Sequence, residues 1–129
     1  MKIAIIGAGN MGGSIAAGLA KGRIVRPEDI ICTARTQNTL EKIKSMDPGI
    51  VVTTDNAMAV KEADVIILAV KPWLMEGVIA GLKEHIDISR QIFVSVAAGI
   101  TLEQLGAWLF PVRPSSVSVF RAIPNTAAS

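Results

Sequence analysis

The sequence predicts an α/β fold in which about six parallel strands form one doubly wound sheet with helices on both faces. Short apolar runs alternate with segments of helical spacing along the chain, the pattern of a parallel sheet with right-handed crossovers. Half of the residues are hydrophobic but only 4% are aromatic, which suits buried strands built from Ile, Val, Leu and Ala. Val65–Val70 is apolar without interruption, as expected of a strand covered on both faces.

The elements are expected in strict alternation, separated by turn-forming residues. The expected strands are Ile3–Ile6, the part of Asp29–Ala34 that contains Ile30-Ile31-Cys32, Ile50–Thr53, Val65–Val70, Gln91–Val96 and Val117–Ile123. The expected helices are Met11–Lys21, about Thr39–Met46, a short helix beginning near Asn56, about Leu74–His85 and a helix opening at Thr101, which with Gln104 has capping-box spacing. The breaks are Asp47-Pro48-Gly49, Lys71-Pro72, and a loop delimited by Pro111 and Pro114.

Length, charge and cysteine content exclude several classes of protein. The 129 residues are expected to form one domain over 1–129, close to the common size of roughly 100 to 150 residues. The formal charge of +2 is spread along the chain, so neither nucleic acid nor a membrane is expected as a partner. Cys32 and His85 are the only residues of their types, so no metal site is expected and both are interpreted as structural.

The N-terminal twenty residues are largely apolar, but glycines interrupt them, which argues against a secretory signal peptide. No apolar run approaches the ~20 residues that a membrane-spanning helix needs. We therefore expect a soluble protein, and the single cysteine fits the reducing cytoplasm.

A glycine-rich turn follows the first expected strand. Gly7-Ala8-Gly9-Asn10-Met11-Gly12 matches G-x-G-x-x-G, in which the first glycine makes a tight turn, the second admits a pyrophosphate and the third permits close helix packing. N–H groups at the helix start would face the phosphates. The alternative is a compact strand-to-helix turn in an unrelated α/β protein. The βαβ setting favours a nicotinamide dinucleotide site and thus an NAD(P)-binding Rossmann fold. Ser14 is interpreted as a packing residue.

The end of the second strand predicts which cofactor binds. An acidic residue there would bind the ribose 2′-hydroxyl of NAD, but this segment reads Thr33-Ala34-Arg35-Thr36-Gln37 and holds no carboxylate. Arg35 can pair with a 2′-phosphate and Thr36 can donate a hydrogen bond to it. NADPH is therefore expected, with NADH still possible. The alternative is that Arg35 is an ordinary solvated side chain.

Three later strand ends carry small side chains and free backbone groups. They are Ala69-Val70-Lys71-Pro72, Ser95-Val96-Ala97-Ala98-Gly99 and Ala122-Ile123-Pro124-Asn125-Thr126. Ligands in open parallel sheets lie beyond the carboxyl ends of the strands, so these segments are expected around the nicotinamide, with Asn125 or Thr126 near its carboxamide. Each also has a plain structural alternative: an exposed lysine at Lys71, a tight turn at 97–99, and a turn former or helix cap at Asn125.

Four segments in this order carry a family resemblance: Ile5–Gly12, Ala69–Pro72, Ser95–Ile100 and Arg121–Thr126. Over its full length the chain resembles pyrroline-5-carboxylate reductases. The resemblance implies reduction of the imine 1-pyrroline-5-carboxylate to proline by NAD(P)H, the last step of proline biosynthesis, and a contact between Asn56 and the adenosine side of the cofactor. The expected cofactor-binding residues are Ile6, Gly7, Ala8, Gly9, Asn10, Met11, Gly12, Arg35, Thr36, Asn56, Ala69, Val70, Lys71, Pro72, Ala97, Ala98, Gly99, Asn125 and Thr126.

The resemblance also implies a helical C-terminal domain that this chain does not contain. In the family that domain supplies the dimer interface, and hence the homo-oligomer, together with much of the substrate pocket. No catalytic residue is assigned here for that reason. The chain alone, whether a shortened form or a natural fragment, is expected to bind NADPH and scarcely to turn over.

Two other functions remain open on the sequence. One is the cofactor domain of a related NADP-dependent oxidoreductase, such as a β-hydroxyacid dehydrogenase or an F420-dependent reductase, which shares the glycine-rich turn. The other is a non-catalytic module that binds nicotinamide cofactors.

Overall fold

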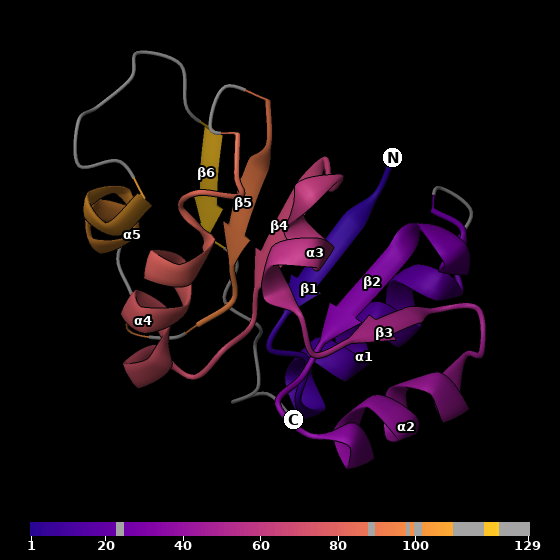
Figure 1. Cartoon of the computed structure of the whole chain (residues 1–129). Helices are drawn as coiled ribbons and strands as arrows, with labels where there is room; N and C mark the ends of the chain where they lie inside the picture. The colour runs from indigo at the N-terminus through magenta and orange to yellow at the C-terminus, as the bar shows by residue number, and fades with distance from the viewer. Residues whose placement is uncertain (23–24, 88–89, 98, 100–101, 110–117, 122–129) are drawn as a thin grey trace.

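The computed structural model describes residues 1–22, 25–87, 90–97, 99, 102–109 and 118–121 (Figure 1). Within these residues, six parallel strands form one sheet in the order β3-β2-β1-β4-β5-β6. The strands are β1 (Ile3–Ile6), β2 (Ile30–Thr33), β3 (Val51–Thr53), β4 (Val65–Leu68), β5 (Ile92–Ser95) and β6 (Ser118–Arg121). The helices are α1 (Asn10–Ala20), α2 (Gln37–Met46), α3 (Asn56–Lys61), α4 (Pro72–Leu82) and α5 (Leu102–Leu109), with a 3₁₀ turn at Pro27–Asp29.

The strand order reverses at the centre of the sheet. β1 pairs on one side with β2 and on the other with β4, so that Ile5 lies opposite both Cys32 and Ile67. The chain therefore winds outward from β1 twice, in opposite directions, and the predicted doubly wound parallel sheet is confirmed. In such a sheet the reversal leaves a crevice at the carboxyl ends of the strands.

Each face of the sheet has its own apolar core, because successive strand residues point to opposite faces. Ala4 and Ile6 belong to one cluster, where side chains of α3, α4 and α5 cover the sheet. Ile3 and Ile5 belong to the other, which includes Ala16 of α1 and Ile43 of α2. Every residue of β1 is buried, which explains the uninterrupted apolar sequence of this strand.

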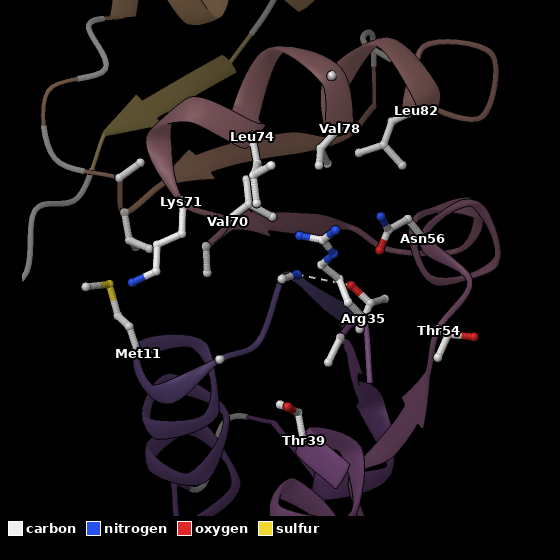
Figure 2. A pocket seen from close by; sticks show the side chains of 18 of the residues that line it. Met11, Arg35, Thr39, Thr54, Asn56, Val70, Lys71, Leu74, Val78 and Leu82 are labelled. Atoms are coloured by element: carbon white, nitrogen blue, oxygen red, sulfur yellow. Dashed lines mark hydrogen bonds between the residues drawn. The ribbon is translucent and has the colours of Figure 1, made fainter. Parts of the chain in front are cut away.

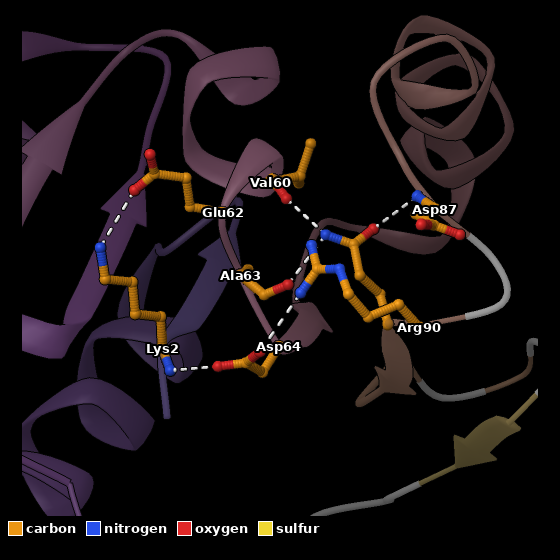
Figure 3. Close-up of polar contacts among 8 residues, drawn as sticks. Lys2, Val60, Glu62, Ala63, Asp64, Asp87 and Arg90 are labelled. Atoms are coloured by element: carbon orange, nitrogen blue, oxygen red, sulfur yellow. Dashed lines mark hydrogen bonds and ion pairs between the residues drawn. The ribbon is translucent and has the colours of Figure 1, made fainter.

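Polar contacts hold the amino ends of β1, β4 and β5 together (Figure 3). The backbone N–H of Lys2 donates to Asp64 at 2.8 Å, and Arg90 donates to the other oxygen of the same carboxylate at 3.2 Å. Gln91 is only 2% exposed, and its amide nitrogen donates to the carbonyls of Val60 at 2.6 Å and Ala63 at 2.8 Å. These contacts lie at the edge opposite the carboxyl ends of the strands.

Some predicted boundaries are wrong by a few residues. β4 ends at Leu68 rather than at Val70, and α4 begins at Pro72 rather than at Leu74, because proline is well suited to the first turn of a helix, where no N–H is needed. α4 ends at Leu82 rather than at His85, whose N–H bonds the Leu82 carbonyl in a tighter turn. The remaining strand and helix ends lie within two residues of the prediction, and those of β1 match it.

The predicted capping residue Thr101 and the prolines at 111 and 114 lie outside the described residues. Among the helices that the structure describes, none combines the length and apolar character that crossing a membrane requires.

Candidate functional site

A cleft with a volume of about 1710 Å³ runs along the carboxyl ends of the strands (Figure 2). It reaches the loops after β1, β2, β3, β4 and β5, and one side of α4 forms part of its wall. Of the predicted site residues, it is lined by Gly7, Gly9, Met11, Arg35, Thr36, Asn56, Ala69, Val70, Lys71, Pro72 and Ala97. The fold thus gathers segments that are far apart in the sequence into one continuous surface.

The three glycines of the turn occupy different surroundings. Gly7 has φ +80°, and a Cβ there would lie 3.0 Å from the Cα of Val70. A Cβ on Gly12 would lie 3.1 Å from the Cβ of Ala8 and 3.3 Å from a methyl group of Ile5, so its absence lets α1 approach β1 closely. A Cβ on Gly9 would meet no heavy atom within 4 Å. Gly9 therefore presents bare backbone to open space in the cleft.

Internal hydrogen bonds occupy the first three N–H groups of this turn. The N–H of Gly7 donates to the Thr33 hydroxyl at 3.1 Å, and that of Ala8 donates to the Thr33 carbonyl at 2.6 Å. The N–H of Gly9 donates to the Gly7 carbonyl at 2.8 Å. The first bond of α1 then runs from Gly13 to the Gly9 carbonyl.

The N–H groups of residues 10, 11 and 12 lie in the first turn of α1, where helix geometry provides no acceptor. No side chain caps this end of the helix. These three groups are consequently the donors that the turn offers to an anion, with the helix dipole adding partial positive charge.

The opposite side of the cleft carries Arg35. It follows β2, is exposed, and in Figure 2 its guanidinium extends into the cleft toward the same region as the Asn56 side chain. Thr36 caps α2: its hydroxyl accepts from the N–H of Thr39 at 3.3 Å. Asn56 opens α3, where the Asp55 carboxylate accepts from the Met58 N–H at 3.1 Å. Arg35 thus stands beside two capped helix starts.

Lys71 and Met11 lie on opposite sides of the other end of the cleft in Figure 2, and both are exposed. Between the two ends, one face of α4 lines the cleft; we call it the cleft face of α4. Leu74, Gly77 and Val78 belong to this face, and Trp73 near the start of the helix is 77% exposed.

Several expected site residues do not line the cleft. Ile6, Ala8 and Gly12 are buried and support the turn from beneath, and Gly99, with φ +81°, is exposed but stands apart from the lining. The side chain of Asn10, together with residues Ala98, Asn125 and Thr126, lies outside what the structure describes. The interpretation of Ser14 as a packing residue is wrong, because Ser14 is exposed and lines the cleft.

Two contributions to the site were missed from sequence. Thr33 was recognised only as part of the second strand's end, although a buried polar residue that closes an apolar strand is itself a sign of a specific hydrogen bond. The cleft face of α4 was missed as well. Its sign is the spacing of Leu74, Gly77, Val78 and Gly81, which places small residues on one helix face.

Cys32 and His85 stand apart from the cleft lining. Cys32 is fully buried in β2, and burial raises the pKa of its thiol to about 12, so the sulfur stays protonated at neutral pH. His85 is exposed in the turn after α4. Among the described residues, no group of three His, Cys, Asp or Glu side chains is placed to hold a metal ion.

The chain is similar to known proteins over nearly its whole length. It is 38% identical to a pyrroline-5-carboxylate reductase of Methanosarcina acetivorans over 128 residues, which are 99% of this chain and 45% of that protein. It is 37% identical to the enzyme of that name from Vibrio alginolyticus, over 97% of this chain and 43% of the relative. The chain therefore spans less than half the length of these relatives.

Solved structures agree with the sequence comparisons. A pyrroline-5-carboxylate reductase from Coxiella burnetii superposes with a TM-score of 0.84 at 34% identity, covering 97% of this chain and 44% of that one. A Plasmodium falciparum pyrroline carboxylate reductase with NADP bound shares the fold, with a TM-score of 0.78 at 21% identity over 98% of this chain and 43% of that one. The family model described as NADP oxidoreductase, coenzyme F420-dependent, matches residues 2–99. This chain belongs to that family of NADP oxidoreductases.

Proposed function

We propose that this chain is the NADPH-binding domain of an oxidoreductase that reduces 1-pyrroline-5-carboxylate to L-proline. One observation carries the cofactor half of the proposal: a single cleft joins the open side of Gly9 and the first N–H groups of α1 to the exposed guanidinium of Arg35. The similarity to pyrroline-5-carboxylate reductases, 38% and 34% identical over nearly the whole chain, supports the choice of substrate.

The cleft fits an extended dinucleotide with phosphates at two places. The N–H groups of residues 10–12 would hold the pyrophosphate, where Gly9 leaves room for close approach. Arg35 would pair with the 2′-phosphate, helped by Thr36, and Asn56 would contact the adenosine. Ala69, Val70, Lys71, Pro72 and Ala97 would surround the nicotinamide, with Asn125 or Thr126 at its carboxamide. The cofactor supplies the hydride, and the protein binds and orients it.

We propose further that residues 1–129 form the cofactor domain and that a helical domain completes the substrate pocket and the homo-oligomer. The share of about 45% that the chain covers in its relatives leaves room for such a domain. The imine would then bind over the nicotinamide between the two domains. We place the enzyme in the cytoplasm, where the single thiol of Cys32 would stay reduced.

Titration calorimetry of the chain with NADPH, NADP⁺ and NADH tests the cofactor proposal. We expect NADPH and NADP⁺ to bind more tightly than NADH, because only they carry the phosphate that Arg35 would neutralise. Absence of binding by a folded sample would overturn the proposal. Equal binding of NADPH and NADH would overturn the role of Arg35 alone.

A chimera tests the substrate. The chain would replace the matching N-terminal part of the Methanosarcina acetivorans relative, to which it is 38% identical. We expect the chimera to oxidise NADPH in the presence of 1-pyrroline-5-carboxylate and to restore growth of a proline auxotroph, whereas the isolated chain should scarcely turn over. A folded chimera that binds NADPH but does not reduce the imine would count against the assignment.

The family description names coenzyme F420, which makes hydride exchange between NADP and this coenzyme a second candidate. To distinguish the two reactions, reduced F420 is mixed with NADP⁺ and a protein that includes this domain. The change in absorbance reports whether F420 is reoxidised. Transfer to NADP⁺ without imine reduction would favour the second candidate.

A further inference from the structure

We propose that Thr33 is a positioning residue that holds the glycine-rich turn in the conformation needed for the cofactor pyrophosphate. The inference rests on the proposed function, because it assigns Thr33 a part in binding the same cofactor. Thr33 is the last residue of β2 and is 1% exposed. It lies beside the turn because β2 pairs with β1 in parallel register.

Thr33 accepts hydrogen bonds from two successive N–H groups of the turn. Its hydroxyl oxygen accepts from Gly7 at 3.1 Å, and its carbonyl oxygen accepts from Ala8 at 2.6 Å. Glycine visits many backbone conformations, including positive φ, so the sequence of the turn alone does not select one. The two bonds to Thr33 fix Gly7 at φ +80° and orient the peptide that follows it.

This arrangement decides which donors remain for phosphate. With the N–H groups of Gly7 and Ala8 bound to Thr33, and that of Gly9 bound to the Gly7 carbonyl, the remaining donors are those of residues 10–12 at the start of α1. Thr33 thus acts on the phosphate through the turn.

The adenosine side of the cleft is held by hydrogen bonds of its own. Ala34, the residue after Thr33, donates its N–H to the Thr53 carbonyl at 3.4 Å, and the Thr53 hydroxyl accepts from the Asp55 N–H at 3.1 Å. Asp55 in turn caps α3, which begins at Asn56. These bonds do not involve the Thr33 side chain, so the adenosine side of the cleft should keep its place when that side chain is changed.

A plain structural role predicts something different. If Thr33 only filled space at the end of β2, valine, which has nearly the same shape, would serve as well. Thr33→Val removes the acceptor and leaves the half-buried Gly7 N–H without a partner. Thr33→Ser keeps the acceptor and removes only a methyl group. Thr33→Ala removes the same acceptor without placing a methyl group against the N–H. It replaces Thr33→Val in the binding test if Thr33→Val does not fold.

The test compares two ligands by calorimetry on folded variants. 2′-Phospho-ADP-ribose contains the pyrophosphate, whereas adenosine 2′-monophosphate reaches only the Arg35 side. Thr33→Val leaves a half-buried N–H unpaired and frees the turn to shift, and binding must restore the turn. Its affinity for 2′-phospho-ADP-ribose and for NADPH should therefore fall by about tenfold to a hundredfold. Its affinity for adenosine 2′-monophosphate should stay near that of the wild type. Thr33→Ser should bind both ligands nearly as the wild type does.

Amide hydrogen exchange at Gly7, measured without ligand, provides an independent readout. Exchange should be slow in the wild type and in Thr33→Ser and fast in Thr33→Val. The inference is overturned if Thr33→Val binds 2′-phospho-ADP-ribose with wild-type affinity, or if its affinity for both ligands falls equally. It is also overturned if Thr33→Ser loses as much affinity for 2′-phospho-ADP-ribose as Thr33→Val does. If the wild type bound no NADPH, the proposed function would fail, and exchange at Gly7 would still decide whether Thr33 holds the turn.

Discussion

The backbone of Gly7 lies directly against Val70, so that a Cβ on Gly7 would be 3.0 Å from the Val70 Cα. This approach joins the ends of β1 and β4 at the point where the strand order reverses. Gly7 also has a positive φ, a conformation that residues with a side chain rarely adopt. The position therefore excludes side chains for two independent reasons.

Gly7→Ala is expected to destabilise the fold and abolish NADPH binding. The strained backbone alone costs about 1–3 kcal/mol, and the new methyl group would collide with Val70. Thermal denaturation and calorimetry measure the two effects. Wild-type stability in Gly7→Ala would contradict the geometry of the turn.

Gly9→Ala is the matched control in the same turn. A Cβ on Gly9 would meet no heavy atom within 4 Å, so the melting temperature should fall less than in Gly7→Ala. NADPH affinity should nevertheless fall, because the methyl group would stand where we propose that the pyrophosphate approaches. Unchanged affinity would argue against that placement.

Arg35→Ala should change cofactor preference rather than stability. Loss of hydrogen bonds from a charged group to the 2′-phosphate should lower the affinity for NADPH by about tenfold to a hundredfold. The affinity for NADH should stay unchanged. The remaining NADPH binding should also depend less on salt. Calorimetry at two ionic strengths measures both effects.

Arg90→Ala is the control for removal of a positive charge. Arg90 is exposed at the amino ends of the strands, where it pairs with Asp64 at 3.2 Å. Its loss should leave cofactor affinity unchanged. Equal effects of Arg35→Ala and Arg90→Ala would reduce the role of Arg35 to general electrostatics.

Cys32 should react with alkylating reagents at pH 8 only as fast as the protein unfolds. Burial raises the pKa of its thiol from 9.0 to about 12, and the thiolate is the reactive form. Mass spectrometry with and without urea measures the labelling rate. Rapid labelling of the folded chain would show that the thiol is accessible.

The same pKa shift links the stability of the protein to pH. Between pH 9 and 12 the unfolded chain loses the Cys32 proton while the folded chain keeps it, so the stabilising contribution of this group is lost as pH rises. The difference in unfolding free energy between the wild type and Cys32→Ala should therefore narrow above pH 9. Urea denaturation at several pH values checks this sign.

Gln91→Leu should lower the free energy of unfolding substantially. Its side chain joins the Val60 and Ala63 carbonyls to the Asp87 N–H, and each buried partner left unpaired costs about 1–3 kcal/mol. Gln37→Leu, at an exposed position in α2, should shift stability by less than about 0.5 kcal/mol. Urea denaturation compares the two, and a similar small effect of both would contradict the buried role of Gln91.

Much of the fold could be predicted because its elements are marked locally. β1 was predicted to the residue, since the apolar run of Ile3–Ile6 stops at Gly7. β4 was predicted too long, because Ala69 and Val70 continue its apolar run. Only their position at the reversal point separates them from the strand, where Val70 lies against Gly7.

The amino-acid sequence alone was sufficient to predict the alternation of strands and helices, the glycine turn and the basic residue after β2, because neighbouring residues mark each of them. The way in which these parts share a cleft became apparent only from the three-dimensional fold. Thr33 and Gly7 are 26 residues apart, and their bond depends on the register of two strands. The cleft face of α4 likewise depends on which side of the helix packs on the sheet. Hydrogen bonds and packing between distant segments follow from strand order and register, which local residue patterns do not specify.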